Sequence, residues 1–111
     1  MAGRVNARPS PEARFATLAE ALLEDPGLSS GRMFGADGLK AGGKVFAMLV
    51  KGHLVLKLPG QRVEALVAAG VGERFDPGHG RILKEWIAIE PESGQDWLSL
   101  ATEAKDFVAE G

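Results

Sequence analysis

The chain has 111 residues, no cysteine and a formal net charge of −2, from 13 basic and 15 acidic residues. The lack of cysteine excludes disulfides, thiolate metal sites and cysteine nucleophiles, and it fits a cytoplasmic protein. A module that binds duplex DNA usually carries a basic excess, so we expect no strong direct binding to nucleic acid.

The first predicted element is a helix that begins at Ser10 and Pro11. A serine side chain can cap free backbone N–H groups, and proline suits the first helical position. Apolar residues then recur every three or four positions, which predicts one buried helical stripe. The stripe consists of Phe15, Leu18, Ala19, Leu22 and Leu23. Pro26 and Gly27 are expected to end this helix.

A three-stranded antiparallel meander is predicted to follow, with glycine turns between its strands. Its first strand, between residues 33 and 39, is expected to be short or bulged because Gly35 and Gly38 interrupt it. The second strand is the apolar run 44–50, which is far too short to cross a bilayer, so no membrane partner is expected. The third strand is 53–58. One face of that strand is apolar: Leu54, Leu56 and Leu58.

A short helix, two strands and a final helix are predicted in the rest of the chain. The short helix has one apolar stripe: Val63, Leu66 and Val67. The strands are expected at 73–76 and 82–89, with a turn at 77–80 between them. Ser93 is expected to start the final helix, with Asp96 three residues later in a capping-box-like pattern. The buried stripe of that helix is Trp97, Leu100, Ala101, Ala104, Phe107 and Val108.

The predicted order α-β-β-β-α-β-β-α indicates an α+β fold. Each helix has one apolar stripe and most strands have one apolar face. The economical arrangement is a two-layer sandwich, with the helices on one face of a five-stranded, mainly antiparallel sheet. Because no repeat or linker divides the chain, we expect a flexible tail at residues 1–9 and a single domain at 10–111.

The sequence offers no convergent catalytic set, and we expect neither an enzyme nor a cofactor or metal site. His53 and His79 are the two histidines, and neither has a partner at a spacing typical of metal ligands. The segment 78–81 begins like a phosphate-binding loop but lacks a third glycine and leads into a strand. Glu85 and Glu90 are expected on opposite faces of a regular strand, which argues against an acid–base pair.

Several basic and aromatic residues near strand ends form a candidate interaction or anion-binding patch. They are Arg32, Lys57, His79, Arg81, Lys84 and Trp86. Such a patch suits an anion or an acidic partner. The alternative is ordinary surface charge for the basic residues, and for Trp86 a place in the core.

A block of glycine, basic and aromatic residues opens the β section: Arg32, Met33, Phe34, Gly35, Gly38, Gly43, Lys44 and Phe46. This block resembles the opening motif of the TfoX/Sxy N-terminal domain family. The following strand, from Gly52 to Lys57, is also similar to that family, and a looser likeness extends from Phe15 to Val108. YjbR-type proteins share a similar opening and are the relatives most easily confused with this pattern.

The resemblance implies a secretion-chaperone-like sandwich and a role in regulating natural transformation in bacteria. Full-length members have a second, C-terminal domain, and we expect this chain to be a stand-alone version of the first. The family is thought to act with a transcription regulator rather than by catalysis. The main hypothesis is therefore a non-catalytic protein-interaction module with a regulatory role, and a homodimer is a candidate assembly. The alternative is a small-molecule or anion-binding domain with weak enzymatic activity.

Overall fold

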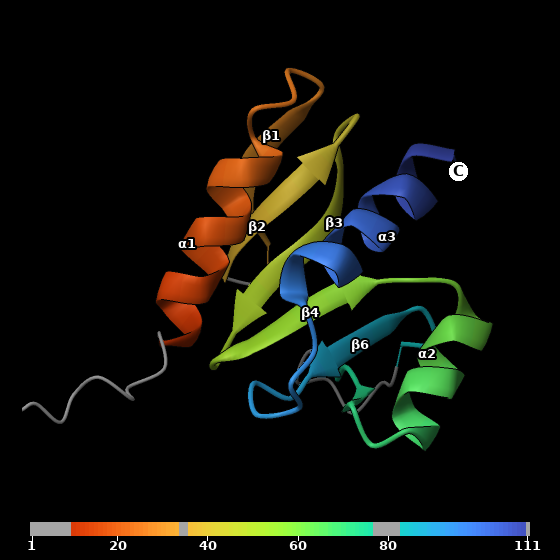
Figure 1. Cartoon of the computed structure of the whole chain (residues 1–111). Coiled ribbons are helices and arrows are strands. Elements are labelled where there is room, and N and C mark those ends of the chain that lie inside the picture. Colours follow the sequence, from red (N-terminus) through yellow and green to blue (C-terminus); the bar gives the residue numbers. More distant parts are fainter. Residues whose placement is uncertain (1–9, 34–35, 77–82, 111) are drawn as a thin grey trace, which may run out of the picture.

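The computed structural model describes residues 10–33, 36–76 and 83–110. The expected tail at 1–9 and the expected turn at 77–80 lie outside these ranges. The described residues form three helices and six strands, in agreement with the α+β class (Figure 1). In chain order they are α1 (Pro11–Leu22), β1 (Leu28–Met33), β2 (Ala36–Ala41), β3 (Lys44–Val50), β4 (His53–Lys57), α2 (Gly60–Ala68), β5 (Gly72–Arg74), β6 (Trp86–Ile89) and α3 (Trp97–Glu110).

The strands form one sheet in the order β1-β2-β3-β4-β6-β5, and every neighbouring pair is antiparallel. The prediction of five strands was wrong by one, because residues 28–41 form two paired strands rather than one bulged strand. β1 gave no periodic signal because it is an edge strand in which Ser29 and Ser30 are exposed. A register shift does occur, but it lies in the pairing of β2 with β3, between Leu39 and Lys40.

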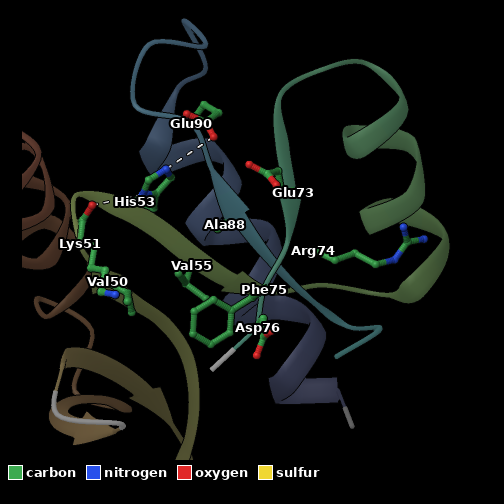
Figure 2. A pocket seen from close by; sticks show the side chains of 10 residues that line it. All are labelled: Val50, Lys51, His53, Val55, Glu73, Arg74, Phe75, Asp76, Ala88 and Glu90. Carbon is green, nitrogen blue, oxygen red and sulfur yellow. Dashed lines mark hydrogen bonds and ion pairs between the residues drawn. The ribbon is translucent and has the colours of Figure 1, made fainter. Parts of the chain in front are cut away.

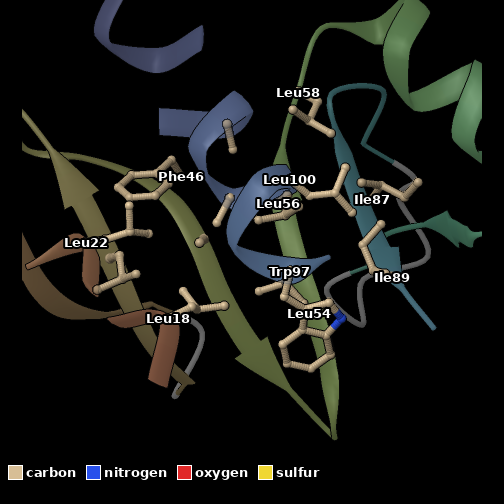
Figure 3. Close-up of a cluster of buried hydrophobic side chains, with 14 of the residues drawn as sticks. Leu18, Leu22, Phe46, Leu54, Leu56, Leu58, Ile87, Ile89, Trp97 and Leu100 are labelled. Carbon is tan, nitrogen blue, oxygen red and sulfur yellow. The ribbon is translucent and has the colours of Figure 1, made fainter. Parts of the chain in front are cut away.

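All three helices cover the same face of the sheet, as predicted (Figures 1 and 3). Cross-strand neighbours from β2, β3, β4 and β6 line this face: Leu39, Ala47, Leu56 and Ile87. The shift between β2 and β3 changes the alternation along β3. Phe46 and Ala47 therefore both join the main core, although adjacent residues of a regular strand point to opposite faces.

The helix ends confirm one predicted cap and correct another. The Ser10 hydroxyl accepts a hydrogen bond from the Ala13 N–H at 3.1 Å, as expected of an N-cap. At α3, however, the Asp96 carboxylate accepts from the N–H groups of Leu98 and Ser99 at 3.1 and 3.4 Å. The predicted start at Ser93 was wrong, because the Ser93 N–H donates to the Glu90 carbonyl and belongs to the turn after β6.

The two strands nearest the C-terminus are shorter than predicted. β6 begins only at Trp86, because residues 83–86 form a turn in which the Trp86 N–H donates to the Leu83 carbonyl at 3.5 Å. β5 ends at Arg74, one residue before Phe75. Both strands nevertheless keep their predicted order, and β6 inserts between β4 and β5 in the sheet.

Candidate functional site

The sheet face opposite the helices has an apolar cluster of its own. Met48, Val55, Ala88 and Glu73 are successive cross-strand neighbours on this face, which we call the Met48 face. Met48 and Val55 are fully buried, and Phe75 packs with them directly after β5. Partly buried apolar residues surround this centre: Ala36, Val50, Leu83, Trp86 and Ala88. The Met48 face therefore has an apolar cluster separate from the main core, and its accessible apolar surface comes from the partly buried residues around the buried centre.

A pocket of about 410 Å³ lies on the Met48 face (Figure 2). Its floor is apolar and consists of Val50, Val55, Phe75 and Ala88. Its rim is charged or ionisable and consists of Lys51, His53, Glu73, Arg74, Asp76 and Glu90. An apolar centre inside a polar rim is the usual anatomy of a protein interface.

One end of the pocket is closed by His53 and Glu90. The imidazole Nε2 lies 3.5 Å from a carboxylate oxygen of Glu90, and Nδ1 lies 3.2 Å from the Lys51 carbonyl oxygen. The two side chains meet because β4 pairs with β6, with Leu54 opposite Ile89. The contact of His53 with Glu90 could not be predicted from sequence spacing, because it depends on this pairing between strands that are distant in the chain.

The other charged rim residues come from the end of β5 and the chain that follows it. The Arg74 guanidinium is directed toward α2, where it lies 3.7 Å from the Glu64 carboxylate (Figure 2). Glu73 is the cross-strand neighbour of Ala88, so its side chain lies on the Met48 face of the sheet. Since Arg74 points away, the charges of the rim are mainly negative, from Glu73, Asp76 and Glu90, with Lys51 as its basic residue.

The predicted patch is divided between separate parts of the described structure. Lys57 and Trp86 are cross-strand neighbours on the Met48 face, with the ammonium 5.9 Å from the indole centroid. The Lys57 ammonium also lies 4.0 Å from a carboxylate oxygen of Glu85. Arg32 lies on the helix-covered face, where its guanidinium donates to Asp37 at 2.9 Å.

Lys84 is exposed in the turn before β6. It lines a pocket together with Gly60, Glu64 and Arg74, away from Arg32. His79 and Arg81 lie outside the described residues. The structure therefore brings Lys57 and Trp86 together, and it places Arg32 and Lys84 elsewhere.

The residues of the family-like motif that the structure describes have roles in the fold. A Cβ atom added at Gly38 would lie 3.0 Å from the Ala47 carbonyl oxygen, so β2 and β3 approach closely there. Gly43 has a φ of +83°, which a turn glycine adopts without strain. Phe46 is buried in the main core, whereas Lys44 is exposed. Arg32 and Met33 belong to β1, and Phe34 and Gly35 lie outside the described residues.

Carboxylates and histidines in the described ranges do not gather into a metal-binding group of three or more. Glu85 and Glu90 each contact a different basic residue, Lys57 and His53 respectively. None of the described helices is both long and apolar enough to cross a membrane.

Comparison with known proteins identifies the family. The TfoX N-terminal domain model matches residues 16–108, which is nearly the whole chain. A search of curated proteins finds no match. The extent of the family match establishes that the chain belongs to the TfoX N-terminal domain family.

Proposed function

We propose that this domain is a non-catalytic protein-interaction module that binds its partner on the Met48 face. The observation that carries the proposal is the apolar pocket floor inside a charged rim, on the sheet face opposite the helices. Apolar surface at the centre of an interface supplies binding free energy when it is removed from water. Charged groups at the rim steer the encounter and select the partner.

The composition of the rim favours a protein surface over a simple anion. Glu73, Asp76 and Glu90 contribute negative charge and Lys51 contributes positive charge, whereas the Arg74 guanidinium points away from the pocket toward Glu64 on α2 (Figure 2). An anion site normally concentrates basic groups around one point. The alternative of an anion or small-molecule site was centred on the predicted patch, and of its described members only Lys57 and Trp86 lie together. Binding of a protein surface that carries basic residues is therefore the function that we propose.

The partner that we propose is a transcription regulator, and the setting is the cytoplasm. Membership of the TfoX N-terminal domain family is consistent with a competence-related role. The absence of cysteine suits a reducing compartment. Homodimer formation stays a prediction, which light scattering at high protein concentration would test. A monomer mass there would contradict it.

An affinity capture experiment tests the proposed surface. The tagged domain is incubated with nuclease-treated lysate of the source organism, and bound proteins are identified by mass spectrometry. Val50→Lys places a charge in the pocket floor at a partly buried position, and Leu98→Lys is the matched control on α3, where Leu98 is 41% exposed. We expect a stoichiometric partner with the wild type and with Leu98→Lys, and its loss with Val50→Lys. Equal capture by both folded variants would contradict the proposal.

A further inference from the structure

We infer that the outer edge of β1 binds an extended segment of a partner protein that carries large apolar and basic side chains, by adding a strand to the sheet. This inference goes beyond the proposed function because it concerns the opposite end of the sheet. Two strands form the sheet edges, β1 with six residues and β5 with three. Within the described ranges, the only strand paired with β1 is β2.

An edge strand offers main-chain groups to another strand. In an antiparallel pair, alternate residues direct their N–H and C=O groups toward the neighbour and the others direct them outward. β1 contains no proline and has Arg32 as its only charged residue, so few of the usual protections against edge pairing are present in it. An extended peptide can therefore be bound by hydrogen bonds to the outward groups of β1.

A groove beside β1 can receive side chains from such a peptide. It has a volume of about 430 Å³ and lies between α1 and the first two strands. α1 packs on β3, β4 and α3, and it runs beside the end of the sheet that β1 and β2 form (Figure 1). The apolar residues that line the groove are Phe15, Ala16, Ala19, Leu23, Leu39 and Leu49.

Ser30 makes the groove accessible from the edge. It is the cross-strand neighbour of the buried Leu39, so its side chain is on the same face as the groove. Because serine is small, a large apolar side chain of an added strand can reach over it toward α1. Leu23 lies at this groove and is 38% exposed, one of two exposed large apolar side chains among the described residues. A bound segment would remove this exposed part of Leu23 from water.

The charge of α1 specifies basic residues in the partner segment. Glu12, Glu20 and Glu24 are exposed on or just after this helix. The basic residue of α1, Arg14, is directed elsewhere, since its Nη1 donates to the Pro91 carbonyl at 2.8 Å. Of these glutamates Glu12 lines the groove, together with the ion pair of Arg32 and Asp37, and lysine or arginine in the partner segment would complement the negative charge of the helix.

A second copy of this chain fits the edge less well. If β1 paired with β1 of a second copy, the side chains brought to the helix-covered face would be Leu28, Ser30 and Arg32. Of these three side chains only Leu28 is a large apolar group, whereas the lining of the groove is mainly apolar. A segment of a different protein is therefore the occupant that we infer.

Selection from a phage-displayed library of random heptapeptides tests this inference. We expect the immobilised wild-type domain to enrich sequences in which large apolar residues alternate with others and lysine or arginine is frequent. An enriched peptide is then synthesised and titrated into the ¹⁵N-labelled domain. We expect slower amide exchange at every second residue of β1, since only the outward N–H groups gain hydrogen bonds.

Matched variants locate the binding site. We expect Leu23→Ser to weaken peptide binding about fivefold, because the part of Leu23 that is exposed, 38%, is removed from water on binding. Leu98→Ser removes the other exposed leucine and should leave affinity unchanged. Val50→Lys should also leave it unchanged, which separates this inference from the proposed function on the Met48 face.

Three results would overturn the inference. The first is the failure of any peptide to be enriched on the wild-type domain. The second is an enriched peptide that protects no β1 amide or binds Leu23→Ser and Leu98→Ser equally. The third is a dimer in the absence of peptide with alternate β1 amides already protected, because the edge would then be occupied by a second copy.

Discussion

The Arg14 guanidinium lies 3.8 Å from the centroid of the Trp97 ring, and the same group donates a 2.8 Å hydrogen bond to the Pro91 carbonyl. This one side chain joins α1 to the first residue of α3 and to the turn that follows β6. The guanidinium stacks on an aromatic ring that is itself buried. A planar guanidinium can stack on the ring while it donates to the carbonyl, whereas an ammonium group cannot stack as a plane.

Arg14→Ala should therefore lower the free energy of unfolding by about 1–2 kcal/mol, from the lost cation–π contact and the lost hydrogen bond. Arg14→Lys should recover less than half of that loss. Urea denaturation monitored by Trp fluorescence measures both values. Arg74→Ala is the control, because Arg74 is partly exposed and its contact with Glu64 is 3.7 Å long. Equal destabilisation by Arg14→Ala and Arg74→Ala would contradict this account.

Two glycine-to-alanine substitutions should have opposite effects. A Cβ atom at Gly72 would overlap the Ala88 carbonyl oxygen and lie 3.0 Å from the Ala88 carbonyl carbon, so β5 and β6 would have to separate. We expect Gly72→Ala to destabilise the domain by about 2 kcal/mol or more. Gly60 begins α2, and the nearest atom to its added Cβ is 3.9 Å away. Gly60→Ala should be neutral or stabilise by up to about 1 kcal/mol. A melting temperature that falls equally in both variants would refute the explanation.

The ion pair between α2 and α3 should contribute modestly. Arg62 Nε and Nη2 donate to the two carboxylate oxygens of Glu103 at 3.0 and 3.1 Å, and both side chains are 41% exposed. A double-mutant cycle with Arg62→Ala and Glu103→Ala should give a coupling energy of about 0.5–1 kcal/mol, reduced by solvent and salt. A coupling energy near zero in low salt would show that the bidentate geometry contributes nothing.

The protonation of Arg62 should not make stability depend on pH near neutrality. The hydrogen bond with Glu103 raises the pKa of Arg62, burial opposes this effect, and charge attraction adds to it. A group whose pKa is raised on folding stabilises the fold fully below its unfolded pKa and loses that contribution as the pH rises through the folded pKa. For arginine this window is strongly alkaline. The Arg62–Glu103 coupling energy should therefore be the same at about pH 7 and pH 9.

Phe46 should be the most costly of these positions to truncate. Its side chain is fully buried where the register of β2 and β3 shifts, and it packs beside Leu22 of α1 in the main core (Figure 3). Phe46→Ala should lower the free energy of unfolding by about 3–5 kcal/mol, through lost transfer free energy and a residual cavity. Phe107→Ala is a useful comparison because Phe107 is only partly buried on α3, and it should cost less.

Most of the fold could be predicted from local patterns. The apolar stripe of α1 and the alternation in β4 identified most of the buried residues, since helical and strand periods are local properties of a sequence. The prediction was wrong for Leu23, which follows the end of α1 and is 38% exposed. Gly70, expected at the end of α2, has a positive φ of +77° there. β1 was not predicted, because an edge strand with exposed Ser29 and Ser30 has little apolar periodicity.

The candidate site was harder to predict, because it depends on which strands become neighbours. His53 and Glu90 are 37 positions apart and meet only because β6 pairs with β4. The predicted patch assumed that residues near strand ends lie close together. Arg32 and Lys57 instead occupy opposite faces of the sheet, which the register of the strands decides. Sequence periodicity identifies the face within one strand but does not give the order of strands in a sheet.

Site-specific photocrosslinking tests the central claim most directly. The photoreactive amino acid p-benzoylphenylalanine is placed at Trp86, a half-buried aromatic position on the Met48 face, and in a second protein at Leu98 on α3. After irradiation in lysate of the source organism, crosslinked products are separated by mass and identified. The account predicts one dominant covalent adduct with a partner protein from position 86 and none of comparable yield from position 98. No adduct at position 86, or the same adducts in equal yield from both positions, would contradict a protein-binding role for the Met48 face.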